Sequence, residues 1–218
     1  MPLLTASHLR RAYGPLPVLN DVSLTVEAGE VISIVGASGA GKSTLLHILG
    51  TLDRPESGEV TLADEAVFAL KDSALARFRN EKIGFIFQFH NLLPEFTALE
   101  NVCIPAFIAN RPEAQTRDRA AHLLDKLGLG ARRGHFPAQL SGGEQQRVAV
   151  ARALINQPAV VFADEPSGNL DSRNAEDLHR LFFDLRHEFG QTFIIVTHNE
   201  ALAAMADRTI TLRDGAVV

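Results

Sequence analysis

The sequence predicts an α/β fold with a mixed, mainly parallel core sheet and a small antiparallel sheet beside it. Two continuous apolar runs, Ala159–Ala163 and Phe193–Thr197, have the composition of strands that are buried on both faces, as in parallel sheets. Helical patterns separate these runs, and alternation of strands with helices is typical of the α/β class. Val22–Val26 alternates with a period of two and Gly58–Leu62 has a similar pattern, so we expect both in the antiparallel sheet.

The length and composition of the chain limit what it can be. With 218 residues, 46% of them hydrophobic, it is one large domain or one domain with an inserted subdomain, and it has enough apolar residues for a sizeable core. The net charge of −5 gives no overall basic field, so we expect no nucleic-acid partner. The single cysteine, Cys103, excludes internal disulfides and fits a reducing compartment. The start of the chain lacks the layout of a signal peptide, and no apolar run approaches the ~20 residues of a membrane span, so we expect a soluble chain that meets a membrane only through partners.

Residues of about 89 to 155 are expected to form a helical insertion in the core. The stretch Thr97–Leu127 has a helical pattern, with breaks expected at Pro105 and Pro112 because proline interrupts the backbone hydrogen bonds of a helix. Ser141 is the expected cap of a further helix that runs to Ile155.

Shorter elements flank this insertion. Either Asp72 or Ser73 is the expected N-cap of a short amphipathic helix that ends at Lys82. The other predicted elements are the strand Ile83–Phe87, the helix Asn174–Phe189, and a C-terminal hairpin of Thr209–Leu212 and Ala216–Val218 around the turn pair Asp214 and Gly215.

The stretch from Val31 to Thr44 carries the first chemical site. Its first five residues, Val31–Val35, are rich in β-branched side chains and predict a buried strand. The next residues fit the phosphate-loop pattern G-x-x-x-x-G-K-[ST], in which glycines let backbone N–H groups turn toward an anion. We expect Lys42 to reach the β- and γ-phosphates of a nucleotide and Ser43 to bind Mg²⁺. The predicted phosphate-binding residues are Gly36, Ala37, Ser38, Gly39, Ala40, Gly41, Lys42, Ser43 and Thr44.

The second site is an apolar strand, Val160–Ala163, that delivers two carboxylates at its C-terminal end. In an open parallel sheet, this end of the strands is where ligands bind. We expect Asp164 to hold the Mg²⁺ shell, and Glu165 to lie beyond the γ-phosphate, where it polarises an attacking water. Beside a phosphate loop, this acidic pair predicts nucleotide hydrolysis.

The third site is a helix start with bare N–H groups, formed by Ser141, Gly142, Gly143 and Glu144, which offers a second place for an anion. One nucleotide already has its phosphate loop, so a second phosphate-binding helix start needs a separate reason. The stretch Leu140–Gln146 resembles the signature motif of ATP-binding cassette (ABC) ATPases. In that family, the signature of one subunit caps the γ-phosphate of ATP that is bound to the phosphate loop of another subunit.

The other motifs of this family are present in the family's order. Tyr13 matches the aromatic residue that stacks on adenine. Gln88 matches the glutamine at the join between the core and the helical subdomain, and the resemblance implies that it contacts Mg²⁺. Asp171 ends Gly168–Asp171, which matches the loop that crosses the dimer interface, and it is also a candidate N-cap of the next helix. His198 matches the switch histidine that contacts the γ-phosphate.

The resemblance covers nearly the whole chain and implies a P-loop NTPase fold of the ABC ATPase type in a single domain. Residues 1–88 and 156–218 would form the core with its antiparallel sheet, and about 89–155 the helical subdomain. Two subunits would form a sandwich homodimer with ATP and Mg²⁺ at the interface, and Lys42, Glu165 and His198 would carry hydrolysis. Reopening of the dimer would drive membrane partners.

A finer resemblance is carried by Gly84–Val102 and Ala163–Asp171, which are similar to the ATPases of lipoprotein-releasing systems, the LolD type. It implies a cytoplasmic subunit, peripheral on the bacterial inner membrane, that drives LolC/LolE-like permease subunits. Ser167 departs from the threonine that many of these ATPases carry. The alternatives are a MacB-type efflux ATPase, an FtsE-type cell-division ATPase, a non-transport ABC ATPase, and a nucleotide-gated binding protein without hydrolysis, although Glu165 after Asp164 argues against the last.

An apolar run after Gln88 has two interpretations. Its members are Phe89, Leu92, Leu93, Pro94, Phe96 and Leu99. They either pack the helical subdomain, or some of them line a groove that holds a short cytoplasmic helix of the permease, because exposed apolar clusters often mark partner sites.

Overall fold

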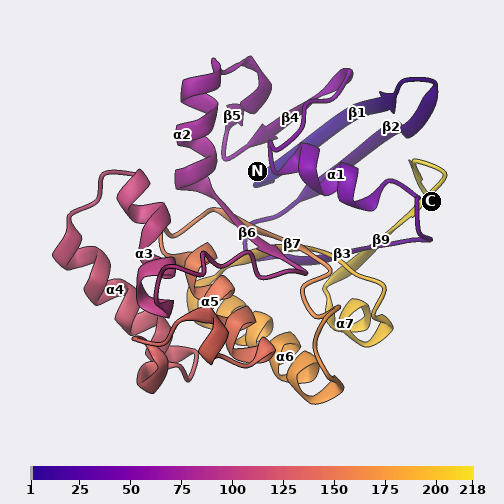
Figure 1. Ribbon diagram of the computed structural model, residues 1–218. Helices are drawn as coiled ribbons and strands as arrows, with labels where there is room; N and C mark the ends of the chain where they lie inside the picture. Colours follow the sequence, from indigo (N-terminus) through magenta and orange to yellow (C-terminus); the bar gives the residue numbers. More distant parts are fainter. Residues whose placement is uncertain (1) are drawn as a thin grey trace.

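A six-stranded sheet lies at the centre of the computed structural model, which describes residues 2–218 (Figure 1). In spatial order its strands are β10 (Ala216–Val217), β9 (Arg208–Arg213), β3 (Val31–Val35), β8 (Thr192–Val196), β7 (Val160–Asp164) and β6 (Ile83–Phe87). The strands from β9 to β6 are parallel, and β10 pairs with β9 in the antiparallel sense at the edge. The predicted mixed, mainly parallel core sheet is therefore confirmed.

A four-stranded antiparallel sheet covers one face of this core sheet. Its order is β2 (Leu16–Val26), β1 (Leu4–Tyr13), β4 (Ser57–Leu62) and β5 (Glu65–Ala66). Helix α1 (Lys42–Leu49) lies on the same side (Figure 1). Side chains of both sheets and of α1 form one hydrophobic cluster, to which Leu9, Ile34 and Leu46 belong. The predicted strands of the antiparallel sheet lie within β2 and β4.

Five helices cover the opposite face (Figure 1). They are α3 (Ala98–Ile108), α4 (Glu113–Lys126), α5 (Gly142–Leu154), α6 (Ser172–Phe189) and α7 (Glu200–Met205), while α2 (Asp72–Lys82) precedes β6. Successive side chains of a strand point to opposite faces, so Val161 and Ala163 of β7 join the cluster under these helices and Phe162 joins the cluster under the antiparallel sheet. Two-sided burial explains why this strand is apolar throughout.

Three of the helices, α3, α4 and α5, lie between β6 and β7 in the chain, in the region where the helical insertion is expected. We call residues 89–155 the helical segment. Between residues 2 and 218, no helix combines the length and the apolar character that spanning a bilayer requires.

Pro105 lies inside α3, so the break expected at this proline is wrong. Pro105 has no N–H to donate to the carbonyl oxygen of Asn101, yet the helix continues past it to Ile108. The Pro105 carbonyl is well satisfied, because the side-chain amides of Asn80 and Asn156 both donate to it at 3.1 Å. The break at Pro112 is confirmed, since this residue is the N-cap of α4.

Helix α2 has the predicted bounds, but its predicted N-cap is wrong. The helix begins after Lys71, whose side chain makes no capping hydrogen bond. Asp72 is already in the first turn, and its carboxylate accepts a hydrogen bond from Arg54 Nη2 at 3.0 Å. A carboxylate in the first turn still favours the helix, because it lies near the positive end of the helix dipole.

Gly84 of β6 lies against α5 so closely that a larger side chain does not fit. A Cβ atom at this position would lie 2.6 Å from the carbonyl oxygen of Ala153. We predict that Gly84→Ala lowers the free energy of unfolding by about 1–3 kcal/mol, because the helix must move away from the sheet. Urea unfolding measures this change.

The matched control is Gly134→Ala, since a Cβ atom there would meet nothing within 4 Å. It should change the free energy of unfolding by less than about 0.5 kcal/mol. Equal stability of the Gly84 and Gly134 variants would contradict the close packing of β6 on α5.

Candidate functional site

The loop Gly36–Thr44, which follows β3 and includes the first turn of α1, has a backbone that only glycine permits at two positions. Gly36 and Gly41 have φ angles of 152° and 97°. A Cβ atom would lie 2.2 Å from Leu212 O at the first position and 2.6 Å from Val18 O at the second. Gly41 is also the N-cap of α1, so the positive end of this helix opens into the loop.

Lys42 folds its side chain back over this loop. Its Nζ donates to the carbonyl oxygens of Gly36 and Ala37, each at 2.9 Å. An ammonium group is thus held beside a helix N-terminus, and both features favour an anion at this place.

The loop is joined to the end of β7 through Ser43 and Asp164. Ser43 Oγ donates to Asp164 Oδ1 at 3.2 Å, and His47 Nε2 lies 3.9 Å from Oδ2. Burial raises the pKa of Asp164, and the hydrogen bond from Ser43 opposes this shift only in part. Among residues 2–218, no group of three His, Cys, Asp or Glu side chains gathers as a metal site. One hydroxyl and one carboxylate suit Mg²⁺, which usually completes its shell with water and phosphate oxygens.

Glu165 and His198 meet at the ends of β7 and β8. His198 Nδ1 lies 2.8 Å from Glu165 Oε2, and the His198 backbone N–H donates to the same oxygen at 3.2 Å. Glu165 has a φ angle of 45°, which is unusual for a residue with a side chain. Its backbone N–H donates to Val196 O at 2.9 Å, which holds the turn against β8. Such strained residues occur frequently at functional sites.

Gln88 pairs with Asn169 rather than with the Ser43–Asp164 pair. Gln88 Nε2 donates to Asn169 Oδ1 at 2.9 Å, and Asn169 Nδ2 donates to Gln88 O at 3.2 Å. Within residues 2–218, no hydrogen bond joins Gln88 to Ser43 or Asp164. The structure therefore ties the end of β6 to the loop that follows β7.

The N-terminus of α5 has the predicted cap and lies against α6. Ser141 Oγ accepts from the backbone N–H of Glu144, and the Glu144 carboxylate accepts from the Ser141 N–H at 2.8 Å. A Cβ atom on Gly143 would lie 2.4 Å from Asn174 Oδ1, so a side chain here would displace the Asn174 side chain. Asp171 is the N-cap of α6 and holds Asn174 through its backbone N–H and its side-chain amide.

The structure brings the predicted site residues together in two groups. Within residues 2–218, no hydrogen bond or ion pair joins the start of α5, Ser141–Glu144, to the loop Gly36–Thr44. Ser141–Glu144 lies beside Asp171 instead. Tyr13 is half-exposed at the end of β1, and its hydroxyl donates to Asp53 Oδ2 at 2.8 Å.

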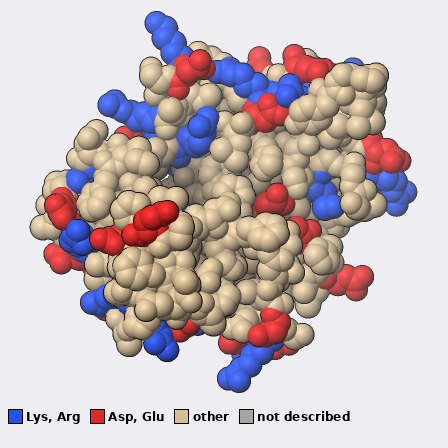
Figure 2. Space-filling view, viewed as in Figure 1, with Lys and Arg blue, Asp and Glu red and all other residues tan. Residues whose placement is uncertain are grey.

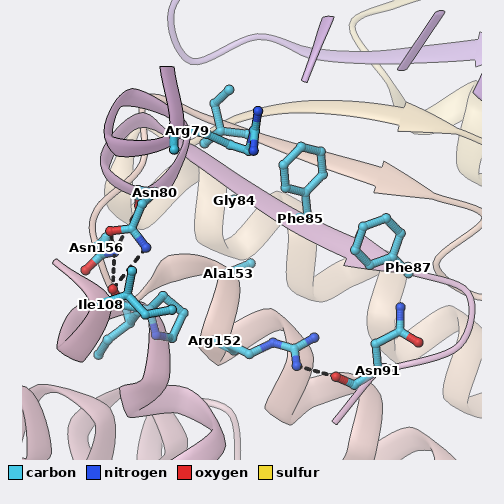
Figure 3. Close-up of a pocket in the computed structure, with 14 residues that line it drawn as sticks. Arg79, Asn80, Gly84, Phe85, Phe87, Asn91, Ile108, Arg152, Ala153 and Asn156 are labelled. Atoms are coloured by element: carbon cyan, nitrogen blue, oxygen red, sulfur yellow. Dashed lines mark hydrogen bonds between the residues drawn. The ribbon is translucent and has the colours of Figure 1, made fainter. Parts of the chain in front are cut away.

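A groove of about 490 Å³ lies between α2, β6, α3 and α5. The space-filling view is hollowed at this place and mostly uncharged there, with basic side chains along the upper rim (Figure 2). Phe85 and Phe87 of β6 present stacked rings to it, and Ile108 faces it from the end of α3 (Figure 3). At the rim, Arg152 of α5 donates to Asn91 O at 2.6 Å and to His90 O at 2.8 Å.

The apolar run after Gln88 does not line this groove. Leu92 and Leu99 pack against the core, as one of the two interpretations holds, whereas Phe89, Leu93 and Phe96 are exposed. The groove is formed instead by α2, β6, the end of α3 and α5.

The chain matches a known family over most of its length. The model of the ABC transporter family matches residues 19–168. This chain belongs to the ABC transporter family. It is 60% identical over 216 residues to the lipoprotein-releasing system ATP-binding protein LolD of Cytophaga hutchinsonii, with 99% of each chain covered. It is also 60% identical over 210 residues to the LolD protein of Bacteroides fragilis, with 96% of this chain and 97% of that chain covered.

A solved structure gives the same fold for this ABC family member. It is the dimeric ATP-binding cassette MJ0796 in a post-hydrolysis state, bound to ADP and Pi. It superposes with a TM-score of 0.88 at 40% sequence identity, over 98% of this chain and 96% of that chain. The predicted ABC ATPase fold is thereby confirmed.

Sequence reasoning missed the role of Gln146, which organises the site of this ABC protein. Gln146 of α5 is fully buried, and its Nε2 donates to Pro166 O at 2.7 Å and to Phe87 O at 3.3 Å, while His90 contacts its carbonyl oxygen. A polar residue among the apolar positions of α5 is a signal of a buried polar link. Its partners lie at the end of β6, in the loop after β6 and in the loop after β7, so the sequence alone does not identify them.

The cap of α6 generates a stability prediction with a pH signature. The backbone N–H and side-chain amide of Asn174 hold the pKa of Asp171 below its usual range. We predict that Asp171→Ala lowers the melting temperature by ~2–4 °C at pH 7, while Asp177→Ala, at an exposed position of the same helix, does not.

Because the folded-state pKa is lowered, the contribution of Asp171 is complete above the ordinary aspartate value of about 3.9 and is lost as the pH falls through the lowered pKa. The difference between parent and variant should shrink in urea titrations near pH 3. A difference that grows on acidification would contradict this role.

Proposed function

We propose that this chain is the ATP-hydrolysing subunit of a lipoprotein-releasing ABC transporter. The observation that carries the proposal is the convergence of Lys42, Ser43, Asp164 and Glu165 at the C-terminal edge of the parallel sheet. The likeness to LolD proteins over the whole chain supports the finer assignment to lipoprotein release.

In this proposal the phosphates of ATP lie on the loop Gly36–Thr44. Lys42 exchanges its two carbonyl partners for oxygens of the β- and γ-phosphates, and the backbone N–H groups at the start of α1 donate to the same phosphates. Ser43 and Asp164 would hold Mg²⁺, with Gln88 as a further contact, and the bound ion would neutralise phosphate charge. The ring of Tyr13 stacks on the adenine base.

Glu165 acts on the attacking water. Its carboxylate accepts a proton from that water, and His198, 2.8 Å away, orients the carboxylate and reaches the γ-phosphate. The positive φ angle of Glu165 and the hydrogen bond from its backbone N–H to Val196 O fix the direction of its side chain. This geometry supports a general-base role.

A complete site requires a second copy of the chain. At the start of α5, Ser141 and Gly142 are exposed, Glu144 is half-buried and Gly143 is buried. This helix start lies apart from the phosphate loop of its own chain. In a sandwich homodimer these residues cap the γ-phosphate bound by the partner subunit, and Asp171 lies at the interface. The dimeric state of MJ0796 supports this arrangement.

Substitution of Glu165 tests the hydrolytic role. Glutamine keeps the shape of the side chain but does not accept the proton, so Glu165→Gln should bind ATP and lose about 10²–10⁴ in rate. Bound ATP should then hold the dimer closed, which light scattering with and without Mg-ATP measures.

The control is Lys42→Ala, which should neither bind ATP firmly nor dimerise, because phosphate oxygens lose a charge-assisted partner. Parental turnover of Glu165→Gln, or its persistence as a monomer in ATP, would refute this assignment.

The groove beside β6 is the proposed docking site for a short cytoplasmic helix of a LolC/LolE-like permease. Apolar side chains of Phe85, Phe87 and Ile108 are suited to an amphipathic helix laid in a groove. The subunit then lies on the cytoplasmic face of the inner membrane and meets the bilayer only through its partners. Residues 1–88 and 156–218 act as the core, and residues 89–155 act as a helical subdomain that moves with the permease.

A charged side chain in the groove should prevent complex formation with the permease without affecting folding of the subunit. Ile108 is exposed, so Ile108→Asp should leave the subunit folded and able to bind ATP, but a buried charge in the complex should abolish co-purification with LolC/LolE-like subunits. Leu93→Asp is the matched control, since Leu93 is exposed and does not line the groove. If Leu93→Asp releases the permease while Ile108→Asp retains it, the docking site is the apolar run instead.

A further inference from the structure

Tyr13 is held by two charged side chains. Its hydroxyl donates to Asp53 Oδ2 at 2.8 Å, and the guanidinium carbon of Arg11 lies 4.7 Å from the centre of its ring. Arg11 also pairs with Asp53, with Nη2 at 3.0 Å from Oδ2 and 3.1 Å from Oδ1. The three side chains therefore form a closed triangle in which each contacts the other two.

Within this triangle, Arg11 contacts only one face of the Tyr13 ring. Arg11 and Tyr13 are two residues apart in β1, on either side of an irregularity in the strand, and their side chains contact each other. The guanidinium covers one face of the ring, yet the Tyr13 residue is 49% exposed. A second flat group can therefore stack on the other face.

Asp53 connects this ring to the helix that begins at the phosphate loop. It lies just after the end of α1, and its backbone N–H donates to His47 O in the last turn of that helix at 3.2 Å. The start of the same helix is the phosphate loop. The hydrogen bond from the Tyr13 hydroxyl to Asp53 thus fixes the position of the ring relative to that loop, although Tyr13 belongs to β1 of the antiparallel sheet.

Asp53 has the charge that this arrangement needs. Burial acts to raise its pKa, but the hydrogen bonds from Tyr13 and the Arg54 backbone, together with Arg11, outweigh burial and leave the pKa lowered. The carboxylate is ionised at neutral pH and can hold the hydroxyl and the guanidinium together.

We propose that Arg11 and Asp53 are positioning residues for the nucleotide base. They hold the Tyr13 ring at a fixed place relative to the phosphate loop, so that the base of a nucleotide finds a preformed stacking surface when its phosphates bind. Fixing the ring before binding removes part of the ordering cost that stacking otherwise carries. This inference rests on the proposed function, in which Tyr13 stacks on adenine.

The test uses two conservative variants of the full chain, Tyr13→Phe and Arg11→Met. The first removes only the hydroxyl, and the second removes the cation but keeps an apolar stem under the ring. Each should raise the KM for ATP ~3–10-fold, the scale of one hydrogen bond, and change kcat less than ~2-fold. The inhibition constant of tripolyphosphate, which has no base, should stay at the parental value in both variants.

The matched control is Arg54→Met. The Arg54 side chain also lies over an aromatic ring, that of Phe68 at 5.7 Å, and pairs with Asp72 rather than with Tyr13 or Asp53. The Arg54 backbone N–H, which donates to Asp53, is kept in this variant. Its KM for ATP should stay parental. A change equal to that of Arg11→Met would overturn the inference, because any loss of a surface arginine would then have the same effect.

Tyr13→Ala separates failure of the inference from failure of the proposed function. If Tyr13→Ala raises the KM for ATP while Tyr13→Phe and Arg11→Met do not, Tyr13 remains the stacking surface and the positioning role is overturned. If KM and the tripolyphosphate inhibition constant rise together in Tyr13→Phe and Arg11→Met, the substitutions act through the phosphate loop and the positioning role is again overturned. If Tyr13→Ala leaves KM unchanged, the stacking role in the proposed function is wrong, and the inference falls with it.

Discussion

Burial of the core sheet on both faces is the constraint on which the rest of this structure depends. Parallel strands need a covering layer on each side, because neither face tolerates water. Here the antiparallel sheet and α1 cover one face, and α3 to α7 cover the other. Alternate residues of β7 belong to different clusters, so β7 has no position for a polar side chain until it ends at Asp164.

The chemistry of the site follows from this constraint. Polar groups are excluded from the strands and gather at their C-terminal ends, where Asp164 meets Ser43 and Glu165 meets His198. The loop before α1 adds a helix N-terminus at the same edge. The groups that we propose bind phosphate and act in hydrolysis therefore converge, although they come from three separate parts of the chain.

The groove and the site are joined by very little chain. Phe87 lines the groove, and the next residue, Gln88, pairs with Asn169 in the loop that follows Glu165. Gln146 strengthens this connection, because its buried side-chain amide donates to backbone oxygens at the end of β6 and in the loop after β7. A partner that shifts β6 or the start of the helical segment would move groups at the site, which suits a subunit that couples hydrolysis to a membrane partner.

The sequence by itself determined the local features of this protein. Apolar runs predicted the parallel strands, the glycine pattern predicted the loop at Gly36–Thr44, and the caps at Ser141 and Asp171 were visible because capping depends on neighbours in the chain. Only the tertiary structure decided which distant groups meet: the pairing of Gln88 with Asn169, the triangle around Tyr13, and a groove beside the predicted apolar run rather than in it. The reason is physical, since helix and strand patterns report contacts within a few residues, whereas these contacts depend on how separate elements pack.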